Sequence, residues 1–578
     1  MVRSVLIANR GEIAVRIVRA CRDQGVRTIA VYSDADADAL HVRLADEAHR
    51  IGPAPARESY LSVDAVLCAA AASGADAVHP GYGLLSENAA FAAAVVDAGL
   101  TWIGPAPDVI ARMGDKVAAL ETARAAQVPV LPGSDGTVEA GPRAARMASE
   151  IGFPLVVKAA FGGGGRGMRV VRSPEDLDAA LIAAAREASA AFGRGDVYVE
   201  RYLDRPRHVE VQILADAHGT VLHLGDRDCS VQRRHQKLIE EAPADLPSDV
   251  RSGLHAAAVR LAREVGYVGA GTVEFLVDGA QFFFLEMNTR LQVEHGVTEL
   301  VTGVDLVAAQ LGVAAGDKLW FAQDDVTVDG HAIQARIAAE DPYAGFRPSP
   351  GTVRGLHLPL GPWVRCDLGV EAGDAVAPEY DSMFGKILAR GPDRDSARRR
   401  LGAALDELLV DGVPTTAPYL RTVLDEETFV DGTHDTGSVE RDWVPTTPPE
   451  ARPAPAPASG RPEAGPRTRR VRIATDRGPV EIAIPSRADR SERIQQGSSG
   501  VGGATSGAAP TAPMDATVVD VPVAAGAAVS AGDVLVVLEA MKMEIEVRAP
   551  VDGTLTAVHV SSGASVAAGT VLADVTPA

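Results

Sequence analysis

The sequence has few cysteines and no long apolar runs. Its four cysteines, Cys21, Cys68, Cys229 and Cys366, are scattered without a Cys-x-x-Cys pair, so we expect reduced thiols rather than a disulfide framework or a structural zinc site. No apolar run reaches the roughly 20 residues that cross a bilayer, and the first residues enter a strand pattern without a signal-peptide layout. We therefore expect a cytoplasmic protein with no membrane partner.

Basic residues are also in deficit. The chain has 56 lysines and arginines against 77 aspartates and glutamates, a formal net charge of -21, which argues against a nucleic-acid-binding surface. Hydrophobic residues make up 46% of the chain and charged residues 23%, a composition typical of a globular protein with a large core. A length of 578 residues suggests three or four structural units.

The C-terminal end contains a short internal repeat. Residues 515–539 align with residues 552–576 at an offset of 37, with 11 of 25 positions identical. Valines and leucines recur among glycines and alanines in each half, which predicts a small two-sheet β-sandwich with pseudo-two-fold symmetry. Lys542, between Met541 and Met543, falls at the predicted hairpin between the halves. It is either an ordinary hairpin lysine or the attachment site of a prosthetic group, and a carrier of this kind implies that the rest of the chain is an enzyme.

The N-terminal stretch alternates apolar runs with helical patterns. Apolar runs at residues 5–8, 28–32, 77–80 and 102–104 are separated by helical segments, a βαβ series that predicts an open parallel sheet. The turn at Asn9-Arg10-Gly11 follows the first strand, at the edge where such sheets bind ligands. A lone glycine turn is weak evidence of a phosphate site, and we interpret it as scaffold.

A glycine-rich loop at residues 162–167 lies between two predicted strands. Backbone amides in such a loop approach an anion closely, as the binding of nucleotide phosphates requires. The loop is not a P-loop, because no Gly-Lys-Ser/Thr follows and the next element is a strand rather than a helix. Lys116 and Lys158 precede it in the sequence, which favours a phosphate site over a floppy surface hairpin.

Two carboxylates and an amide fall on neighbouring β-type segments. Glu274 lies in one segment, and Glu286 and Asn288 lie in the next. Hard oxygen ligands of this kind suit Mg²⁺, or Mn²⁺, bridging the phosphates of ATP. The alternative, a solvated acidic pair on a sheet, is disfavoured by the apolar residues around them.

A series of short motifs runs in a fixed order from the N-terminus to about residue 445. They are His79-Pro80-Gly81-Tyr82-Gly83, Ser86-Glu87-Asn88, Met113-Gly114-Asp115-Lys116, the glycine loop, Arg207-His208-Val209-Glu210, Arg227-Asp228-Cys229-Ser230, Gln232-Arg233-Arg234-His235-Gln236-Lys237, the run from Glu286 to His295, and Tyr380-Asp381-Ser382-Met383. In this order the chain resembles biotin carboxylase, an ATP-grasp enzyme. The pentapeptide around Lys542 resembles the attachment site of biotinyl carrier domains, whereas lipoyl domains usually carry Asp-Lys-Ala. Carboxylase first and carrier last looks like the alpha subunit of an actinobacterial-type acyl-CoA carboxylase; pyruvate carboxylase shares the first domain but would need several hundred further residues.

The resemblance implies a role for individual positions. The implied ATP contacts are Lys116, Lys158, Gly163, Gly164, Gly165, Glu200, Arg201, Tyr202, Leu203, His208, Gln232, His235, Glu274 and Glu286. The implied metal ligands are Glu274, Glu286 and Asn288, and the implied bicarbonate pocket consists of Lys237, Arg290, Gln292 and Val293. Glu294 is implied to deprotonate bicarbonate for attack on the γ-phosphate of ATP, and Arg336 to stabilise the enolate form of biotin. The implied catalytic set is therefore Lys237, Arg290, Glu294 and Arg336.

The implied activity is the ATP- and bicarbonate-dependent carboxylation of biotin bound covalently to Lys542, the first half-reaction of an acyl-CoA carboxylase in lipid metabolism. The implied partners are a carboxyltransferase (beta) subunit, a biotin protein ligase and further copies of the chain. Two alternatives are weighed against this reading. One is a carrier and assembly subunit with a degenerate ATP-grasp scaffold, which the intact site residues disfavour; the other is a different ATP-grasp ligase, such as a carbamoyl-phosphate enzyme, which leaves Lys542 unexplained. The sequence does not identify the acyl-CoA.

We expect a multidomain α/β (α+β) architecture. Residues 1–115 are expected to form an α/β domain, 116–328 an ATP-grasp domain with a mobile glycine-loop lid, 329–445 a C-terminal α+β domain, and 511–578 an all-β biotinyl domain. Residues 446–510 read as a linker rich in proline, alanine and glycine. A hairpin predicted within residues 467–486 is either a docking element for another subunit or a decorated linker.

Two positions depart from the pattern of the family. Gly296 stands where proline usually follows Glu-His, and Arg347 stands where leucine commonly precedes Pro-Ser-Pro-Gly. We expect glycine to loosen the loop just past Glu294. No side chain with an implied role is lost at either position.

Overall fold

The computed structural model describes residues 2–134, 136–160, 168–192, 194–446, 468–475, 478–485, 509–513, 516–540, 543–566 and 569–577. The chain divides into two compact units, of which the first covers Met1–Thr447 and the second holds most of the residues that follow. Each unit is described by itself.

The first unit begins with a parallel sheet. Its strand order is β3-β2-β1-β4-β5, and every pairing within it is parallel, so the predicted βαβ series is confirmed. The strands and the helices between them are β1 (Ser4–Ile7), α1 (Gly11–Asp23), β2 (Arg27–Ser33), α2 (Leu40–Leu44), β3 (Glu47–Gly52), α3 (Val63–Ser73), β4 (Ala77–His79), α4 (Ala89–Asp97) and β5 (Thr101–Trp102). The side chains of Ser62 and Asn88 cap α3 and α4, as these residue types do at helix N-termini.

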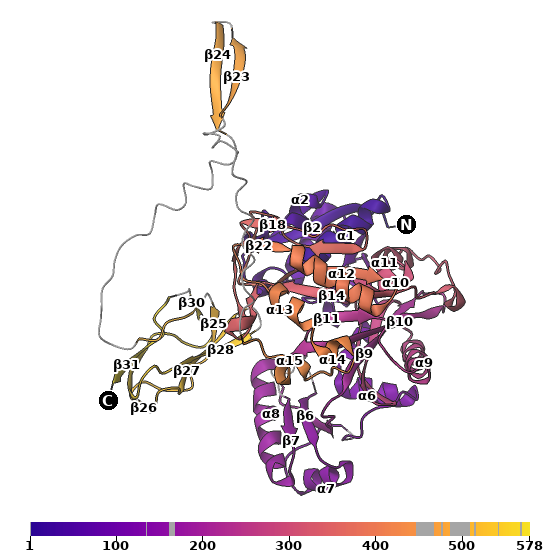
Figure 1. Cartoon of the computed structure of the whole chain (residues 1–578), viewed down its shortest axis with the longest axis vertical. Coiled ribbons are helices and arrows are strands. Elements are labelled where there is room, and N and C mark those ends of the chain that lie inside the picture. Colours follow the sequence, from indigo (N-terminus) through magenta and orange to yellow (C-terminus); the bar gives the residue numbers. More distant parts are fainter. Residues whose placement is uncertain are drawn as a thin grey trace. The chain divides into compact units, whose positions relative to one another are not determined.

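A large antiparallel sheet forms the centre of the first unit (Figure 1). Its strand order is β13-β12-β9-β10-β11-β14-β21-β19. The pairing of β11 with β14 makes the sheet continuous across residue 328, where the sequence suggested a domain boundary. Its strands are β9 (Arg207–Ala215), β10 (Val221–Arg233), β11 (Gln236–Ala242), β12 (Gly269–Asp278), β13 (Gln281–Asn288), β14 (His331–Ala338), β19 (Val364–Leu368) and β21 (Met383–Gly391), and its larger helices are α9 (Ser248–Glu264) and α12 (Arg394–Glu407).

A small lobe of the first unit carries the glycine-loop region, at the bottom of Figure 1. Three antiparallel strands, in the order β7-β6-β8, pack with two helices. The elements are α7 (Pro142–Ile151), β6 (Leu155–Ala159), β7 (Arg169–Val171), α8 (Leu177–Phe192) and β8 (Val197–Arg201). The predicted loop connects β6 to β7, as expected, but residues 161–167, with Gly163, Gly164 and Gly165, lie outside the described residues.

Two short apolar helices follow the site described below: α10 (His295–Thr302) and α11 (Leu306–Ala314). In the described part of the chain no single helix is long and apolar enough to cross a membrane, although these two pass that test as a pair bent by 95°. Most residues of both helices are buried within the first unit.

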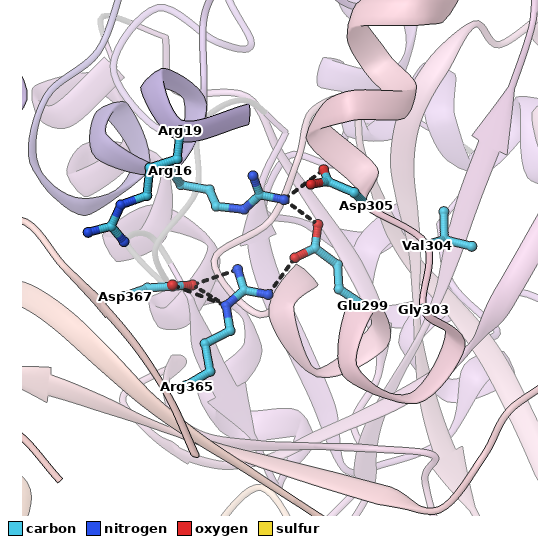
Figure 2. Close-up of a pocket in the computed structure, with 8 residues that line it drawn as sticks. All are labelled: Arg16, Arg19, Glu299, Gly303, Val304, Asp305, Arg365 and Asp367. Carbon is cyan, nitrogen blue, oxygen red and sulfur yellow. Dashed lines mark hydrogen bonds and ion pairs between the residues drawn. The ribbon is translucent and has the colours of Figure 1, made fainter. Parts of the chain in front are cut away.

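A pocket of about 360 Å³ lies where α1, α10 and β19 meet (Figure 2). Glu299 of α10 pairs with Arg16 of α1 at 2.9 Å and with Arg365 of β19 at 2.7 Å. Arg16 also pairs with Asp305 at 2.7 Å, and Arg365 with Asp367 at 2.7 Å. The charges of the lining are balanced, so we do not expect the pocket to attract an ion of one sign. Its ion pairs connect the three elements.

The C-terminal β-domain follows the sequence repeat. Strands β28-β27-β25-β30 form one sheet and β26-β29-β31 the other, which confirms the predicted two-sheet sandwich. The strands are β25 (Ala516–Asp520), β26 (Ala528–Val529), β27 (Val534–Ala540), β28 (Met543–Arg548), β29 (Gly553–Val558), β30 (Ser565–Val566) and β31 (Ala573–Pro577). The repeated glycines turn the chain at equivalent places, with φ of 94° and 86° at Gly526 and Gly563, values that favour glycine. Lys542 lies between β27 and β28, outside the described residues.

The hairpin predicted in the linker is present. Strands β23 (Thr468–Thr475) and β24 (Gly478–Pro485) pair antiparallel with each other.

Candidate active site

The site is built on a row of charged residues that crosses four strands. The register places Glu286 of β13 beside Glu274 of β12, Glu274 beside Glu210 of β9, and Glu210 beside Arg227 of β10. Three neighbouring carboxylates repel one another unless cations lie between them. The row therefore requires positive charge, and the sheet supplies part of it.

Lys237 of β11 is the first such cation. Its ammonium group contacts Glu210 at 2.6 Å, Glu274 at 2.9 Å and Glu294 at 2.7 Å. Burial alone would lower the pKa of Lys237, but the surrounding acidic groups raise it well above its usual value. The lysine therefore stays charged and gathers three carboxylates around one point.

Glu294 is held between two cations. One carboxylate oxygen accepts from Lys237, and the other accepts from Arg336 of β14 at 3.0 Å. Burial would raise the pKa of Glu294, but Lys237, Arg336 and Arg227 hold it well below its usual range. Arg336 also donates to Glu240 at 2.5 Å. The pKa of Glu240 is raised, chiefly by burial, so the two carboxylates that share Arg336 differ in acidity.

The expected metal ligands lie at the other end of the row. Burial and the charge of Glu274 raise the pKa of Glu286, which marks a carboxylate short of positive charge. The amide nitrogen of Asn288 donates to Glu274 at 2.9 Å, and its amide oxygen accepts from Arg290 at 2.9 Å. These hard oxygen atoms fit a divalent cation such as Mg²⁺.

A second group of metal-type ligand atoms, from His208, Glu210 and Glu274, lies within 4.8 Å. The ammonium group of Lys237 already contacts both of its carboxylates. A divalent cation there would meet that positive charge. The metal position expected at Glu274 and Glu286 shares only Glu274 with this group and stays a prediction.

The expected ATP contacts surround the metal end. Lys158 of β6 pairs with Glu200 of β8 at 2.7 Å, and both side chains are buried. Lys116 is the first residue of α6 (Lys116–Ala125). His235 lies in the turn between β10 and β11, and its pKa is lowered by desolvation and by the positive charge of Lys158, His208 and Lys116. The structure thus places His235 within electrostatic reach of Lys158 and Lys116.

The other ATP-contact residues lie on the strands that bound this region. Gln232 is buried on β10 and His208 on β9, and the side chain of His208 lies 3.0 Å from Glu274. The expected hinge begins at the end of β8, where Arg201 is exposed and Tyr202 and Leu203 are half-buried.

The segment after β13 carries the expected bicarbonate pocket. Arg290 contacts Glu87 at 2.9 Å and Asn288 at 2.9 Å. The amide of Gln292 donates to Glu274 at 2.7 Å, and the carbonyl of Val293 accepts from Lys386 at 2.6 Å. These contacts bring the pocket residues, the base and the metal end into one cluster.

The expectation of a loose loop after Glu294 is wrong. Gly296 lies in the first turn of α10 and is buried. A β-carbon at this position would lie 2.6 Å from a methyl carbon of Leu388. Packing of Leu388 against the helix thus accounts for glycine here.

Four residues of this site carry no role in the sequence prediction: Glu87, Glu210, Arg227 and Glu240. One of them, Glu210, lies in a strand in which polar residues alternate with apolar ones, His208-Val209-Glu210-Val211-Gln212. Alternation places such residues on one face of a strand. This alternation is the sequence signal that could have identified Glu210.

Family models match four consecutive parts of the chain. They are the biotin carboxylase N-terminal domain at residues 1–110, the ATP binding domain of the carbamoyl-phosphate synthase L chain at 115–321, the biotin carboxylase C-terminal domain at 334–441, and the biotin-requiring enzyme model at 509–575.

Individual relatives agree with these matches. The biotin-dependent acyl-coenzyme A carboxylase alpha3 subunit of Mycobacterium leprae is 46% identical over 570 residues, which cover 95% of this chain and 94% of that protein. Biotin carboxylase of Haemophilus influenzae is 52% identical over 434 residues, 75% of this chain and 97% of that one. The crystal structure of a Campylobacter jejuni biotin carboxylase complex matches 76% of this chain and 99% of that chain, with a TM-score of 0.75 and 45% identity.

A solved structure with ligands is also similar. The biotin carboxylase domain dimer of Hydrogenobacter thermophilus 2-oxoglutarate carboxylase, in complex with magnesium ADP, ADP and bicarbonate, has a TM-score of 0.74 and 44% identity. It covers 76% of this chain and 97% of that chain.

The fold and the charged row thus define an ATP-grasp ligase. The chain belongs to the biotin carboxylase family, in the form that carries a biotinyl domain on the same polypeptide. It is an enzyme that uses ATP, Mg²⁺ and bicarbonate to carboxylate biotin.

Proposed function

We propose that this chain performs the first half-reaction of an acyl-CoA carboxylase. It carboxylates biotin carried on Lys542 and passes the carboxyl group to a separate carboxyltransferase (beta) subunit. The observation that carries this proposal is the similarity to an acyl-coenzyme A carboxylase alpha subunit along 95% of the chain. The choice of acyl-CoA then belongs to the partner.

Glu294 acts as the base on bicarbonate. It is ionised at neutral pH because Lys237 and Arg336 lower its pKa, but a carboxylate with a low pKa is a weak base. Bicarbonate bound beside Lys237 competes for that ammonium group. When Lys237 turns toward bicarbonate, the basicity of Glu294 rises at the moment that a proton is available.

The other pocket residues orient bicarbonate for attack on the γ-phosphate. The guanidinium of Arg290 offers a planar fork to a planar anion, and Gln292 and the backbone at Val293 complete the pocket. The attack forms carboxyphosphate and ADP. Carboxyphosphate decomposes to CO₂ and phosphate close to where biotin binds.

The ATP phosphates bind at the metal end of the row. Lys116 and Lys158 supply positive charge to them, His208 and His235 offer ring nitrogens as hydrogen-bonding groups, Gln232 supports the ribose side, and residues 200–203 form the adenine hinge. Glu274, Glu286 and Asn288 would hold a magnesium ion, which would neutralise charge at these phosphates. Gly163, Gly164 and Gly165 of the glycine loop are the proposed backbone contacts of these phosphates.

Arg336 serves biotin. When the N1′ nitrogen of biotin loses its proton to phosphate, negative charge develops on the ureido oxygen. A guanidinium already held by Glu240 and Glu294 is preorganised to stabilise that charge, and one such donor is worth roughly 10²-fold in rate.

The division of labour follows the proposed domains: residues 1–115, 116–328 and 329–445 for carboxylation, 446–510 as linker and 511–578 as carrier. The partners are the carboxyltransferase, a biotin protein ligase and further copies of the chain within a larger complex, and the setting is the cytoplasm. Bicarbonate-dependent ATP hydrolysis by the purified chain, with free biotin as acceptor, tests the proposal. No bicarbonate-dependent hydrolysis by a folded chain would favour the scaffold alternative.

A further inference from the structure

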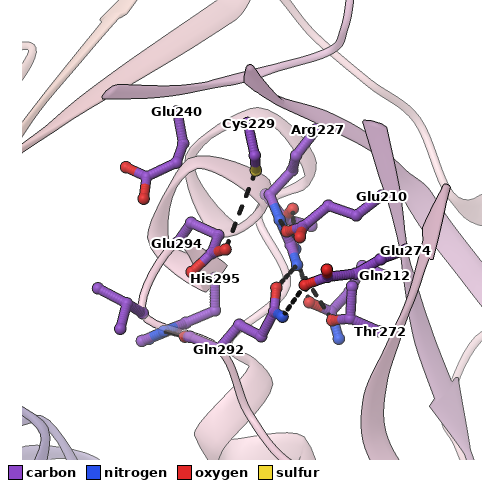
Figure 3. A network of polar contacts seen from close by, with 12 residues as sticks. Glu210, Gln212, Arg227, Cys229, Glu240, Thr272, Glu274, Gln292, Glu294 and His295 are labelled. Atoms are coloured by element: carbon purple, nitrogen blue, oxygen red, sulfur yellow. Dashed lines mark hydrogen bonds and ion pairs between the residues drawn. The ribbon is translucent and has the colours of Figure 1, made fainter. Parts of the chain in front are cut away.

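One buried cation of the site has no role in the proposed reaction. Arg227 of β10 lies behind the bicarbonate pocket, and its side chain is 0% exposed. A buried guanidinium is costly unless its donors are paired, so its partners are informative. It donates from Nε to Glu210 at 2.5 Å, from Nη1 to Gln212 at 2.6 Å and Thr298 at 3.0 Å, and from Nη2 to Thr272 at 3.1 Å and Gln292 at 3.2 Å, in the network of Figure 3.

The contact with Gln292 sets the direction of its amide. A guanidinium has no acceptor, so the amide oxygen of Gln292 must face Arg227. The amide nitrogen consequently points the other way, where it donates to Glu274 at 2.7 Å. Without Arg227, either end of the amide could face the pocket.

The contact with Glu210 sets the position of Lys237. One oxygen of Glu210 accepts from Arg227, and the other accepts from Lys237 at 2.6 Å. Because Glu210 is 0% exposed, no water competes for these oxygens. Arg227 thereby determines which oxygen of Glu210 accepts from the ammonium group of Lys237.

We propose that Arg227 is the positioning residue of the bicarbonate pocket. The guanidinium of Arg227 orients the amide N–H of Gln292 toward bicarbonate. Through Glu210, it also positions the ammonium group of Lys237 toward the same bicarbonate. A lysine at position 227 has a single nitrogen and cannot bridge both partners in a fixed geometry. The inference rests on the proposed function, in which Lys237 and Gln292 bind bicarbonate.

The test is Arg227→Lys, assayed by ATP hydrolysis with free biotin at varied bicarbonate. Supporting residues of this kind typically contribute about 10- to 100-fold, so we expect the KM for bicarbonate to rise at least about tenfold while the KM for MgATP changes less than about twofold. Arg207→Lys is the matched control. Arg207 pairs with Asp228 of β10 at 2.5 Å, in the same sheet but away from the pocket, so its bicarbonate KM should match wild type.

Gln292→Ala separates the two levels of the proposal. If this variant keeps the wild-type bicarbonate KM, the pocket assignment itself fails. If it raises the KM but Arg227→Lys does not, the pocket stands and the positioning role is overturned. In the double variant the two effects should be less than additive, because Arg227 acts partly through Gln292; full additivity would contradict the inference.

Glu210→Gln provides a second route if Arg227→Lys does not fold. The amide oxygen must again face the guanidinium, so the amide nitrogen would face Lys237 and displace it. We expect a raised bicarbonate KM with a Tm near that of wild type. A folded Glu210→Gln enzyme with wild-type bicarbonate KM would overturn the proposal that Arg227 positions Lys237 through Glu210.

Discussion

At the scale of single residues, the site is governed by competition for cations. Glu294 is shared by Lys237 and Arg336, and Arg336 is in turn shared with Glu240. Each substrate that binds must take a cation from a carboxylate. Binding and activation of the base are therefore coupled through the same side chains.

Replacing Glu294 tests its proposed role as the base. Glu294→Gln should still bind ATP, because its amide lies away from the phosphate end of the row. It should lose about 10²- to 10⁴-fold of bicarbonate-dependent ATP hydrolysis, since an amide cannot accept the bicarbonate proton. The measurement is phosphate release with and without bicarbonate, with nucleotide binding as the control. Unchanged turnover would remove Glu294 from the role of base.

Arg336→Ala should uncouple the two steps. Carboxyphosphate can form and decay without biotin being carboxylated, so we expect ATP cleavage to continue in part while carboxylation of free biotin falls roughly 10²-fold or more. The measurement is phosphate released per biotin carboxylated. If this ratio stays at the wild-type value while both rates fall together, Arg336 serves the ATP step or the fold instead.

The residue types of the site could be read from the sequence, but not all of its contacts. Glu274 and Glu286 were expected side by side, and the register places them so. Arg227 and Glu240 received no role, because strand alternation gives the face of a residue but not its partner from a strand many residues away. Lys237 and Glu294, 57 residues apart, meet only through the fold.

At the scale of elements, strand β21 supports the pocket from behind. Lys386 donates to the carbonyl of Val293 at 2.6 Å and lies 3.1 Å from Glu12 of α1. Both charged side chains are almost fully buried. Tyr82 also donates to Glu12. Through Lys386 and Glu12, the segment before Glu294 is connected to the N-terminal part of the first unit.

We expect Lys386→Met to destabilise the protein by about 3–5 kcal/mol, because Glu12 is left as a buried charge without its cation. It should also raise the KM for bicarbonate, because the Val293 carbonyl loses its donor. The measurements are the free energy of unfolding and bicarbonate kinetics. Lys318→Met, the same change at an exposed lysine, is the control and should alter neither.

Adding Glu12→Gln separates the two effects of Lys386→Met. Neutralising Glu12 should restore part of the stability but not the bicarbonate KM. Recovery of both together would mean that Lys386 acts on the pocket only through global stability.

The elements show where local sequence reasoning ends. Parallel strands and the β-repeat carry local periodicity, and both were predicted correctly. The start of α10 at His295 was not, because Gly296 disfavours a helix locally and only the distant Leu388 explains it. The pairing of Ile239 with Ala335 likewise joins strands that no local pattern connects.

At the scale of the whole molecule, the small number of lysines helps to distinguish the lysines of the carboxylase site from the lysine that carries biotin. The chain contains six lysines: Lys116, Lys158, Lys237, Lys318, Lys386 and Lys542. Three have proposed roles in the active site and Lys386 is buried. Modification by a ligase requires an accessible amine, which leaves Lys318 and Lys542 as candidates. Only Lys542 lies in the hairpin between the two halves of the β-repeat.

We therefore predict that Lys542→Arg abolishes biotinylation and with it carboxyl transfer to acyl-CoA, while ATP-dependent carboxylation of free biotin stays within about twofold of wild type. The reason is that the base, the bicarbonate pocket and the nucleotide site are all built from residues of the first unit, and the substitution keeps the charge of the side chain. Intact mass and streptavidin blotting of the denatured chain report biotinylation, and the free-biotin assay reports the carboxylase. Lys318→Arg is the matched control and should retain biotin. A Lys542→Arg chain that still binds streptavidin would move the attachment site elsewhere, whereas loss of free-biotin carboxylation in a folded Lys542→Arg chain would mean that the carrier contributes to the carboxylase site itself.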